Sequence, residues 1–179
     1  MHPRLAELVD YLDAQRAVLL AAVKTIPAGR RDDRVDPECW SVAEVLEHLH
    51  RVENGIARLL SRSLERAKAG GLDSESEVGS VMASLDALRI TERSRRISAP
   101  EPVMPRGELT AAQGITALTE SRRTLVSALA AADGLALGQI TRTHPTLGPL
   151  NLYQWVLFVG QHEARHVGQL QDIARQLAV

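Results

Sequence analysis

The stretch NLYQWVLFVGQHEARHVGQLQDIARQL, residues 151–177, decides the fold class. Apolar residues recur in it at spacings of three and four, which is the period of a helix with one buried face. Asn151 is suited to be the N-cap of this helix, and we predict that the helix runs to about Leu177. Its buried stripe is predicted to consist of Leu152, Trp155, Val156, Val159, His162, His166, Leu170, Ile173 and Leu177.

Two histidines, His162 and His166, occupy positions of this stripe where a hydrophobic residue is expected. A buried imidazole needs a partner, because an unsatisfied polar group costs roughly 1–3 kcal/mol. Residues at i and i+4 lie one above the other on a helix, so both rings can reach one metal ion. The spacing leaves two other interpretations open: a pair of hydrogen-bonded core histidines, or a helix rotated so that both rings meet solvent.

The segment HEARH also matches H-E-x-x-H, the helix signature of zinc peptidases. Such enzymes take a third ligand from further along the chain, and Asp172 has the spacing of one class. That class requires a glycine three residues after the second histidine, where this chain has Gln169. The sequence also lacks the strands along which a peptidase aligns its substrate. Both features argue against a peptidase.

Three further helices are predicted, at about residues 4–25, 42–68 and 109–132, and no strand pair is expected. Ser41 and Glu44 form a capping box in sequence at the start of the second helix. Four helices in one short chain predict an all-α fold, a four-helix bundle.

The connection between the second and third helices is long, about residues 71–107. It contains a possible short helix at about 81–88, a basic ERSRR segment, and the segment APEPVMPRG, whose prolines predict an extended chain. A connection of this length can cross the whole molecule, so the helices that it joins can run parallel.

The composition is that of an ordinary globular domain of 179 residues, with 45% hydrophobic and 3% aromatic residues. We predict a single domain over residues 1–179. The net charge of -1 gives no field that would attract nucleic acid or an anionic membrane, so neither is expected as a partner. There is no signal peptide and no membrane-spanning segment, which predicts a cytoplasmic location. The single cysteine, Cys39, excludes an intramolecular disulfide and is expected to be a small, partly buried residue.

A metal site needs a third protein ligand, and upstream of the last helix the candidates are His48 and His50. Each lies off the centre of the apolar stripe of the second helix, on opposite sides, so periodicity hardly separates them. Boundary residues on a wet face explain both histidines equally well. His2 lies at the terminus, and His144 precedes Pro145 in a loop, where a role in a turn or at a rim is expected.

The chain resembles the DinB-like superfamily, whose members are small metal-binding four-helix bundles related to bacterial thiol-dependent transferases. The resemblance covers nearly the whole chain and depends on WSVAEVLEHLHRVE, on APEPVMP in the long connection, and on HPTLGPLNLYQWVLFVGQHEARHVGQL. It implies a metal triad of His48, His162 and His166. It also implies an up-down-down-up bundle, with a long crossover between helices 2 and 3, and a homodimer.

Three neutral imidazole ligands with an open position suit Zn²⁺, and also Ni²⁺, Fe²⁺ or Mn²⁺. Such an ion acidifies a bound thiol or water. The resemblance, to characterised mycothiol- and bacillithiol-dependent enzymes, implies a low-molecular-weight-thiol S-transferase acting on a small molecule, and a metal hydroxide would support a hydrolase. The alternatives are a non-catalytic metal-binding module of stress-response type and a bundle with an empty site.

Two glutamates near these histidines are candidate catalytic residues, as a base or as groups that orient a ligand. Glu44 precedes His48 by one turn and is also the expected capping residue; Glu163 follows His162 and is also suited to a salt bridge. Trp40 and Trp155 are expected to anchor the core, and Arg165 and Gln169 lie either in the pocket or on the surface.

Overall fold

The computed structural model describes residues 1–94 and 98–177 and consists mostly of helix. Its four long helices are α1 (Pro3–Lys24), α2 (Val42–Ala69), α3 (Ala111–Ala130) and α4 (Leu152–Leu177). Both ends of each helix lie within about two residues of the predicted ends, so the mostly helical fold is confirmed. None of the helices in the described ranges combines the length and apolar character needed to cross a bilayer.

Reciprocal capping explains where three of these helices begin. Ser41 Oγ accepts the backbone N–H of Glu44, and the Glu44 carboxylate accepts the backbone N–H of Ser41, as predicted. Thr110 and Gln113 form the same pair at α3. The predicted cap of α4 is confirmed as well, because Asn151 Oδ1 accepts the backbone N–H of Gln154. These short-range bonds satisfy first-turn donors that have no partner inside the helix.

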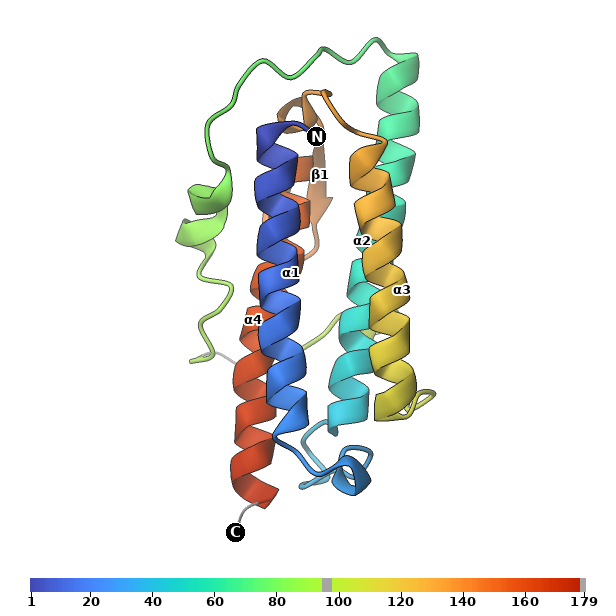
Figure 1. The fold of residues 1–179 in the computed structure, drawn as a ribbon, viewed down its shortest axis with the longest axis vertical. Helices are drawn as coiled ribbons and strands as arrows, with labels where there is room; N and C mark the ends of the chain where they lie inside the picture. The colour runs from blue at the N-terminus through green and yellow to red at the C-terminus, as the bar shows by residue number, and fades with distance from the viewer. Residues whose placement is uncertain (95–97, 178–179) are drawn as a thin grey trace.

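The helices pack as two close pairs, α1 with α4 and α2 with α3. In Figure 1, α1 and α4 run downwards while α2 and α3 run upwards, so α2 and α3 are parallel neighbours. Glycine allows the close approach in each pair. A Cβ atom on Gly114 would lie 2.9 Å from the Cβ of Leu46, and one on Gly160 would lie 2.4 Å from the ring of Tyr11.

The long connection between α2 and α3 crosses the top of the molecule, descends beside α4 and then turns back towards the start of α3 (Figure 1). It contains two 3₁₀ helices, η2 (Met82–Leu88) and η3 (Glu101–Val103). The predicted short helix at 81–88 is therefore present. The extended conformation predicted for APEPVMPRG is wrong at η3, because Pro102 sits in the first turn, where its missing N–H is not needed. Residues 95–97 of the basic segment lie outside the described residues.

A two-stranded antiparallel hairpin precedes α4, where no strands were predicted. It consists of β1 (Thr141–His144) and β2 (Gly148–Asn151), with His144 opposite Gly148 at the turn. The strands are too short to show a period of two in the sequence, and an isolated hairpin of this size is marginally stable. Here it lies against α4, where the indole N–H of Trp155 donates to the carbonyl of Arg142 at 3.3 Å.

Candidate metal centre

Three imidazole rings meet between α2 and α4. Nε2 of His162 lies 3.3 Å from Nε2 of His48 and 3.2 Å from Nε2 of His166. One ring nitrogen from each histidine lies within 4.8 Å of the other two, a grouping that can hold a metal ion. His162 and His166 come from successive turns of α4, and His48 comes from the second turn of α2.

Hydrogen bonds on the opposite side of two rings determine which nitrogen is free. Nδ1 of His48 donates to the carbonyl of Val103 at 2.7 Å, and Nδ1 of His166 donates to Oε1 of Gln169 at 2.8 Å. In the neutral rings both Nε2 atoms therefore carry lone pairs, and both face Nε2 of His162. Lone pairs that face one another this closely need a proton or a cation between them.

Aromatic side chains enclose the three rings. Phe158 stacks on His162 with ring centroids 5.1 Å apart. Trp40 packs against His48 at 5.0 Å and lies nearly parallel to His166 at 6.3 Å. Trp40 is half-buried; it packs against the apolar cluster that contains Leu46, as predicted, and it also covers the histidines. His162 keeps no hydrogen bond on Nδ1 among the described residues, so Phe158 is the group that orients its ring.

Burial lowers the pKa of all three imidazoles. For His48, burial outweighs the hydrogen bond to Val103, which raises the pKa. Burial and then the nearby His48 lower the pKa of His166 to about 3. The pKa of His162 falls well below its ordinary value through burial and then the two neighbouring imidazoles. The rings are therefore neutral near pH 7, the form in which imidazole binds metal.

The spacing of the nitrogens fits a metal ion. Two ligand nitrogens that each lie about 2.0–2.1 Å from a tetrahedral zinc ion are about 3.3 Å apart. The two Nε2 separations at His162, 3.3 and 3.2 Å, agree with that value. The donor set also fits, because the Nδ1 bonds of His48 and His166 are of the kind that fixes ligand histidines.

Comparison with known proteins agrees with this geometry. Residues 3–170 match the sequence model of the DinB superfamily. The chain belongs to the DinB superfamily. It is also 24% identical over 156 residues to the uncharacterized protein YuaE of Bacillus subtilis (strain 168), an alignment that covers 87% of this chain and 90% of YuaE. No solved structure matches the chain significantly.

In this DinB-superfamily chain the other histidines lie outside the cluster. His50, which spacing alone could not separate from His48, turns towards α3, and its Nδ1 donates to the carbonyl of Ala117 at 3.0 Å. The side chain of His2 accepts the backbone N–H of Arg4 at the start of α1. His144 ends β1, and its Nδ1 accepts the backbone N–H of Thr146 in the hairpin turn.

The two candidate catalytic glutamates both bind arginines. Glu44 caps α2 and accepts from the guanidinium of Arg34, with Nε 2.8 Å from Oε2. Burial alone would raise its pKa, but the bonds from Arg34 and Ser41 outweigh burial and lower it. Glu163 turns away from the histidines into the centre of the bundle, where it accepts from Arg16 and Arg122.

Glu163 belongs to a buried cluster of four charges, one from each long helix, that the sequence analysis did not identify. We call Arg16, Glu53, Arg122 and Glu163 the ion layer. Oε1 of Glu163 lies 2.6 Å from Nη2 of Arg16 and 3.0 Å from Nη2 of Arg122, while Oε1 of Glu53 lies 2.6 Å from Nε of Arg122. Burial raises the pKa of Glu163, and the two arginines oppose that effect.

The ion layer lies between two apolar clusters of the core, one around Leu8 and Leu60 and the other around Leu19 and Leu46. A signal for it was present in the sequence. Arg16 stands between Leu12 and Leu19 at helical spacing, so it interrupts an apolar stripe just as the histidines of α4 do.

Glu47, whose role was also not predicted from the sequence, holds the end of the long connection against α2. Its buried carboxylate accepts the backbone N–H groups of Arg106, Gly107 and Glu108 at 3.0–3.2 Å. Burial raises its pKa, but these bonds and the one from Arg51 outweigh burial and lower it. Because the next residue, His48, binds the carbonyl of Val103, two consecutive side chains of α2 attach the connection beside the three-histidine cluster.

The metal-free protein is expected to lose stability as the pH falls from about 6.5 towards 5. The folded-state pKa values of His48, His162 and His166 lie below the value of about 6.5 for an unfolded chain. The unfolded state therefore binds more protons in this window, so the free energy of unfolding falls with pH. Each imidazole contributes up to about 1.4 kcal/mol per pH unit.

Chemical denaturation of metal-stripped protein at several pH values measures this slope. The variant His166→Gln removes one of the titrating groups, so its stability should depend less steeply on pH. Equal slopes for the two proteins would show that the buried imidazole of His166 does not titrate as inferred.

Proposed function

We propose that His48, His162 and His166 hold a divalent metal ion, and that this centre activates a low-molecular-weight thiol or water for attack on a small electrophile. The observation that carries the proposal is the meeting of three neutral imidazoles, in which Nε2 of His162 lies at the ligand spacing of a tetrahedral metal from Nε2 of both His48 and His166. Membership of the DinB superfamily supports it. Zn²⁺ suits this donor set best, and Ni²⁺, Fe²⁺ and Mn²⁺ also accept imidazole ligands.

A divalent ion on three neutral ligands supplies Lewis acidity, which lowers the pKa of a coordinated thiol or water towards neutrality. The protein's own groups hold and shield the ion. Val103 and Gln169 orient two rings through Nδ1, and Phe158 and Trp40 keep water from their apolar faces. His162 is half-buried, and we propose that a small molecule reaches the centre on the side where this residue is exposed.

Neither Glu44 nor Glu163 is given the role of base in this proposal. Glu44 is occupied by Arg34 and by the cap of α2, and Glu163 by the ion layer. Glu163 instead positions α4, and with it His162, relative to the other three helices.

We further propose that the whole chain is one domain, an up-down-down-up bundle of the superfamily type. The parallel course of α2 and α3 and the long connection between them support this arrangement. The homodimer and the cytoplasmic location stay predictions, and size-exclusion chromatography with light scattering tests the first of them.

An assay of metal-loaded protein with several thiols and a chromogenic aryl halide tests the transferase function. The thiol sulfur forms a bond to the ring carbon, the halide leaves with the bonding electrons, and the thiol proton goes to solvent. We expect turnover with at least one thiol that disappears when the metal is removed and returns when it is restored. An aryl ester without thiol tests the hydrolase function in the same way.

The control for this assay is His50→Ala, which alters a neighbouring histidine of α2 outside the cluster. It should keep the activity of the unchanged protein. Metal-bound protein without turnover on any of these substrates would refute the enzymatic proposal and favour a non-catalytic metal-binding module.

A further inference from the structure

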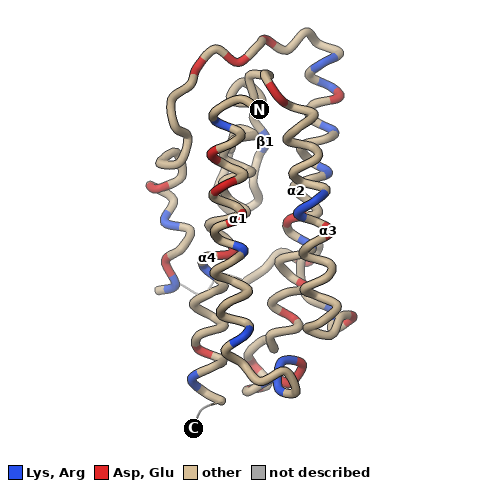
Figure 2. Tube along the Cα trace, in the orientation of Figure 1, with Lys and Arg blue, Asp and Glu red and all other residues tan. Residues whose placement is uncertain are grey.

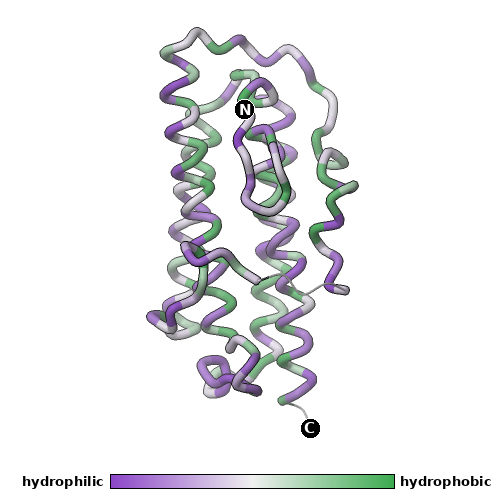
Figure 3. Tube along the Cα trace, turned by 180° about the vertical axis from the view of Figure 1, so that it is seen from behind, coloured by the Kyte–Doolittle hydropathy of each residue, from purple (hydrophilic) through white to green (hydrophobic). Residues whose placement is uncertain are grey.

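A cavity of about 430 Å³ lies on the outer side of α2, apart from the metal centre. It is bounded by α2, by η3 and by the residues before α3, and none of the three clustered histidines lines it. Figure 3 shows, from behind, how the end of the long connection crosses the lower half of the molecule from the side of α4 towards α2 and α3. The volume falls in the range of small-molecule sites.

Gly55 forms part of the cavity floor. A Cβ atom placed on it would meet nothing within 4 Å, so the space above this residue is open. Gly55 follows His48 by two turns, so it lies about 10 Å further along the axis of α2. A larger side chain at this position would therefore project into the cavity without disturbing the packing of α2.

The polar groups of the cavity are of two kinds. Arg51 is already paired, because its guanidinium lies 2.9 Å from both Glu47 and Glu108. Asn54 and Arg58, which follow on the same face, have no hydrogen bond or ion pair with any residue in the ranges 1–94 and 98–177. A cation and an amide without protein partners are thus directed to one cavity.

His50 adds an acceptor to this set. Its Nδ1 donates to the carbonyl of Ala117, so in the neutral ring Nε2 carries the lone pair. Pro102, Val103 and Leu109 supply apolar surface opposite these polar groups. A few polar groups facing an apolar wall is the usual composition of a small-molecule site.

The surrounding charge favours an anion. Arg58 belongs to the upper half of α2, which Figure 2 shows to be rich in Lys and Arg, and Arg62 and Arg66 follow it. Two carboxylates, of Glu47 and Glu108, also line the cavity. Both are paired with Arg51, and Glu47 in addition accepts three backbone N–H groups. They therefore oppose an anionic ligand less than free carboxylates would.

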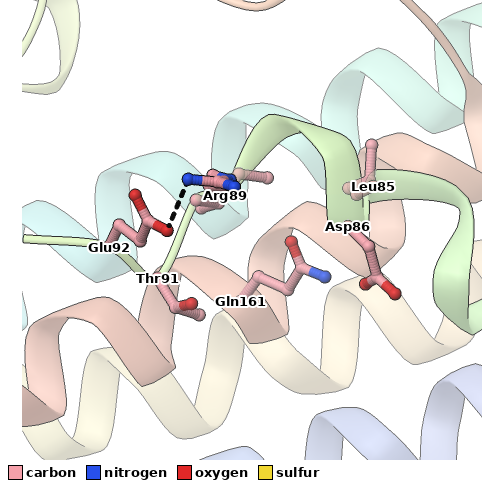
Figure 4. Close-up of a pocket in the computed structure, with 7 residues that line it drawn as sticks. Leu85, Asp86, Arg89, Thr91, Glu92 and Gln161 are labelled. Carbon is pink, nitrogen blue, oxygen red and sulfur yellow. Dashed lines mark ion pairs between the residues drawn. The ribbon is translucent and has the colours of Figure 1, made fainter.

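A second, smaller cavity of about 180 Å³ lies beside Gln161 of α4, between this helix and η2 with the residues that follow η2 (Figure 4). Its cation is not available, because Arg89 is paired with Glu92 at 3.3 Å. Asp86 adds a further negative charge to the same cavity. The comparison makes the cavity on α2 the better anion site.

We propose that the cavity on α2 binds a small organic acid that also carries a hydroxyl group or an amide N–H. Arg58 pairs with its carboxylate, the Asn54 amide donates to the same group, and Nε2 of His50 accepts a hydrogen bond from the hydroxyl or N–H. The site concerns residues that do not hold the metal, so it stands independently of the proposed enzymatic function. Val103 links the two, since it lines the cavity while its carbonyl binds Nδ1 of His48.

Titration of the full-length protein with lactate, followed by two-dimensional amide NMR, tests the proposal. We expect shifts confined to residues 50–58 and 102–109, and weaker binding of propionate, which lacks the hydroxyl group. Arg58→Gln should weaken lactate binding about ten-fold, the loss expected of an exposed charge-assisted hydrogen bond. Arg62→Gln removes a comparable exposed arginine one turn further along α2 and should leave the affinity unchanged.

Gly55→Leu is expected to abolish binding by filling the cavity. Leucine favours a helix over glycine, so loss of binding in this variant cannot be ascribed to a weaker α2. Inorganic phosphate is the competing anion, and tighter binding of phosphate than of lactate would overturn the assignment to a carboxylate. Equal lactate affinity in Arg58→Gln and in the unchanged protein would overturn the site itself. So would lactate-induced shifts of amide signals that come only from residues outside the cavity.

Discussion

Substituting His166→Ala is expected to remove the metal from the purified protein. Nε2 of this residue lies 3.2 Å from that of His162, and its Nδ1 is held by Gln169, so no other described side chain can take its place without rearrangement. A structural zinc site of four ligands is worth about 10–16 kcal/mol, or about 2.5–4 kcal/mol per ligand. Loss of one ligand should therefore weaken binding on the order of a hundred- to a thousand-fold.

Metal analysis after equilibrium dialysis against a weak chelator measures this effect. His50→Ala is the matched control, because it removes a histidine of α2 that binds the carbonyl of Ala117 and not the cluster. It should keep the metal content of the unchanged protein. A His166→Ala protein that folds and holds as much metal as the control would disprove the three-histidine centre, whatever its activity.

The variant Arg122→Met is expected to lose about 3–5 kcal/mol of unfolding free energy, the usual cost of breaking a buried ion pair by removing one partner. Arg122 donates to Glu53 at 2.6 Å and to Glu163 at 3.0 Å, and only 8% of its surface is exposed. Its loss leaves two buried carboxylates to share Arg16. Urea denaturation of metal-stripped protein measures the change without a contribution from the metal.

Arg123→Met is the control for the ion layer, since the next residue of α3 carries the same side chain on the exposed face of the helix. It should change stability by less than about 0.5 kcal/mol. The double variant Arg122→Met with Glu53→Gln removes one charge of each sign. Its loss of unfolding free energy should be smaller than the sum of the losses in the two single variants. If Arg122→Met were as stable as Arg123→Met, the ion layer would not contribute to the fold.

The ion layer and the three-histidine cluster are connected through α4. His162 and Glu163 are consecutive residues that face different directions, one towards His48 of α2 and the other into the core. The pairs that Glu163 makes with Arg16 and Arg122 therefore fix the rotation of α4 about its axis. That rotation brings both histidines of α4 to face His48.

Much of the fold could be predicted from residues close together in the chain. The period of three and four located the long helices, and the caps at Ser41 and Asn151 placed two of their starts. The interrupted stripe of α4 singled out His162 and His166. The hairpin was missed because four-residue strands show no period and depend on docking against α4.

The helices and the pair of histidines on α4 follow from residue patterns alone, because both depend on interactions within about four residues. The histidine of α2 that meets this pair is fixed by packing, since His48 and His162 are separated by 114 positions in the chain. The same holds for Glu53 and Arg122, 69 positions apart, and for the cavity that α2 forms with η3. Periodicity indicates that a side chain is buried. Which partner the side chain meets depends on how the helices are rotated and packed, and the packing of the whole core determines this rotation.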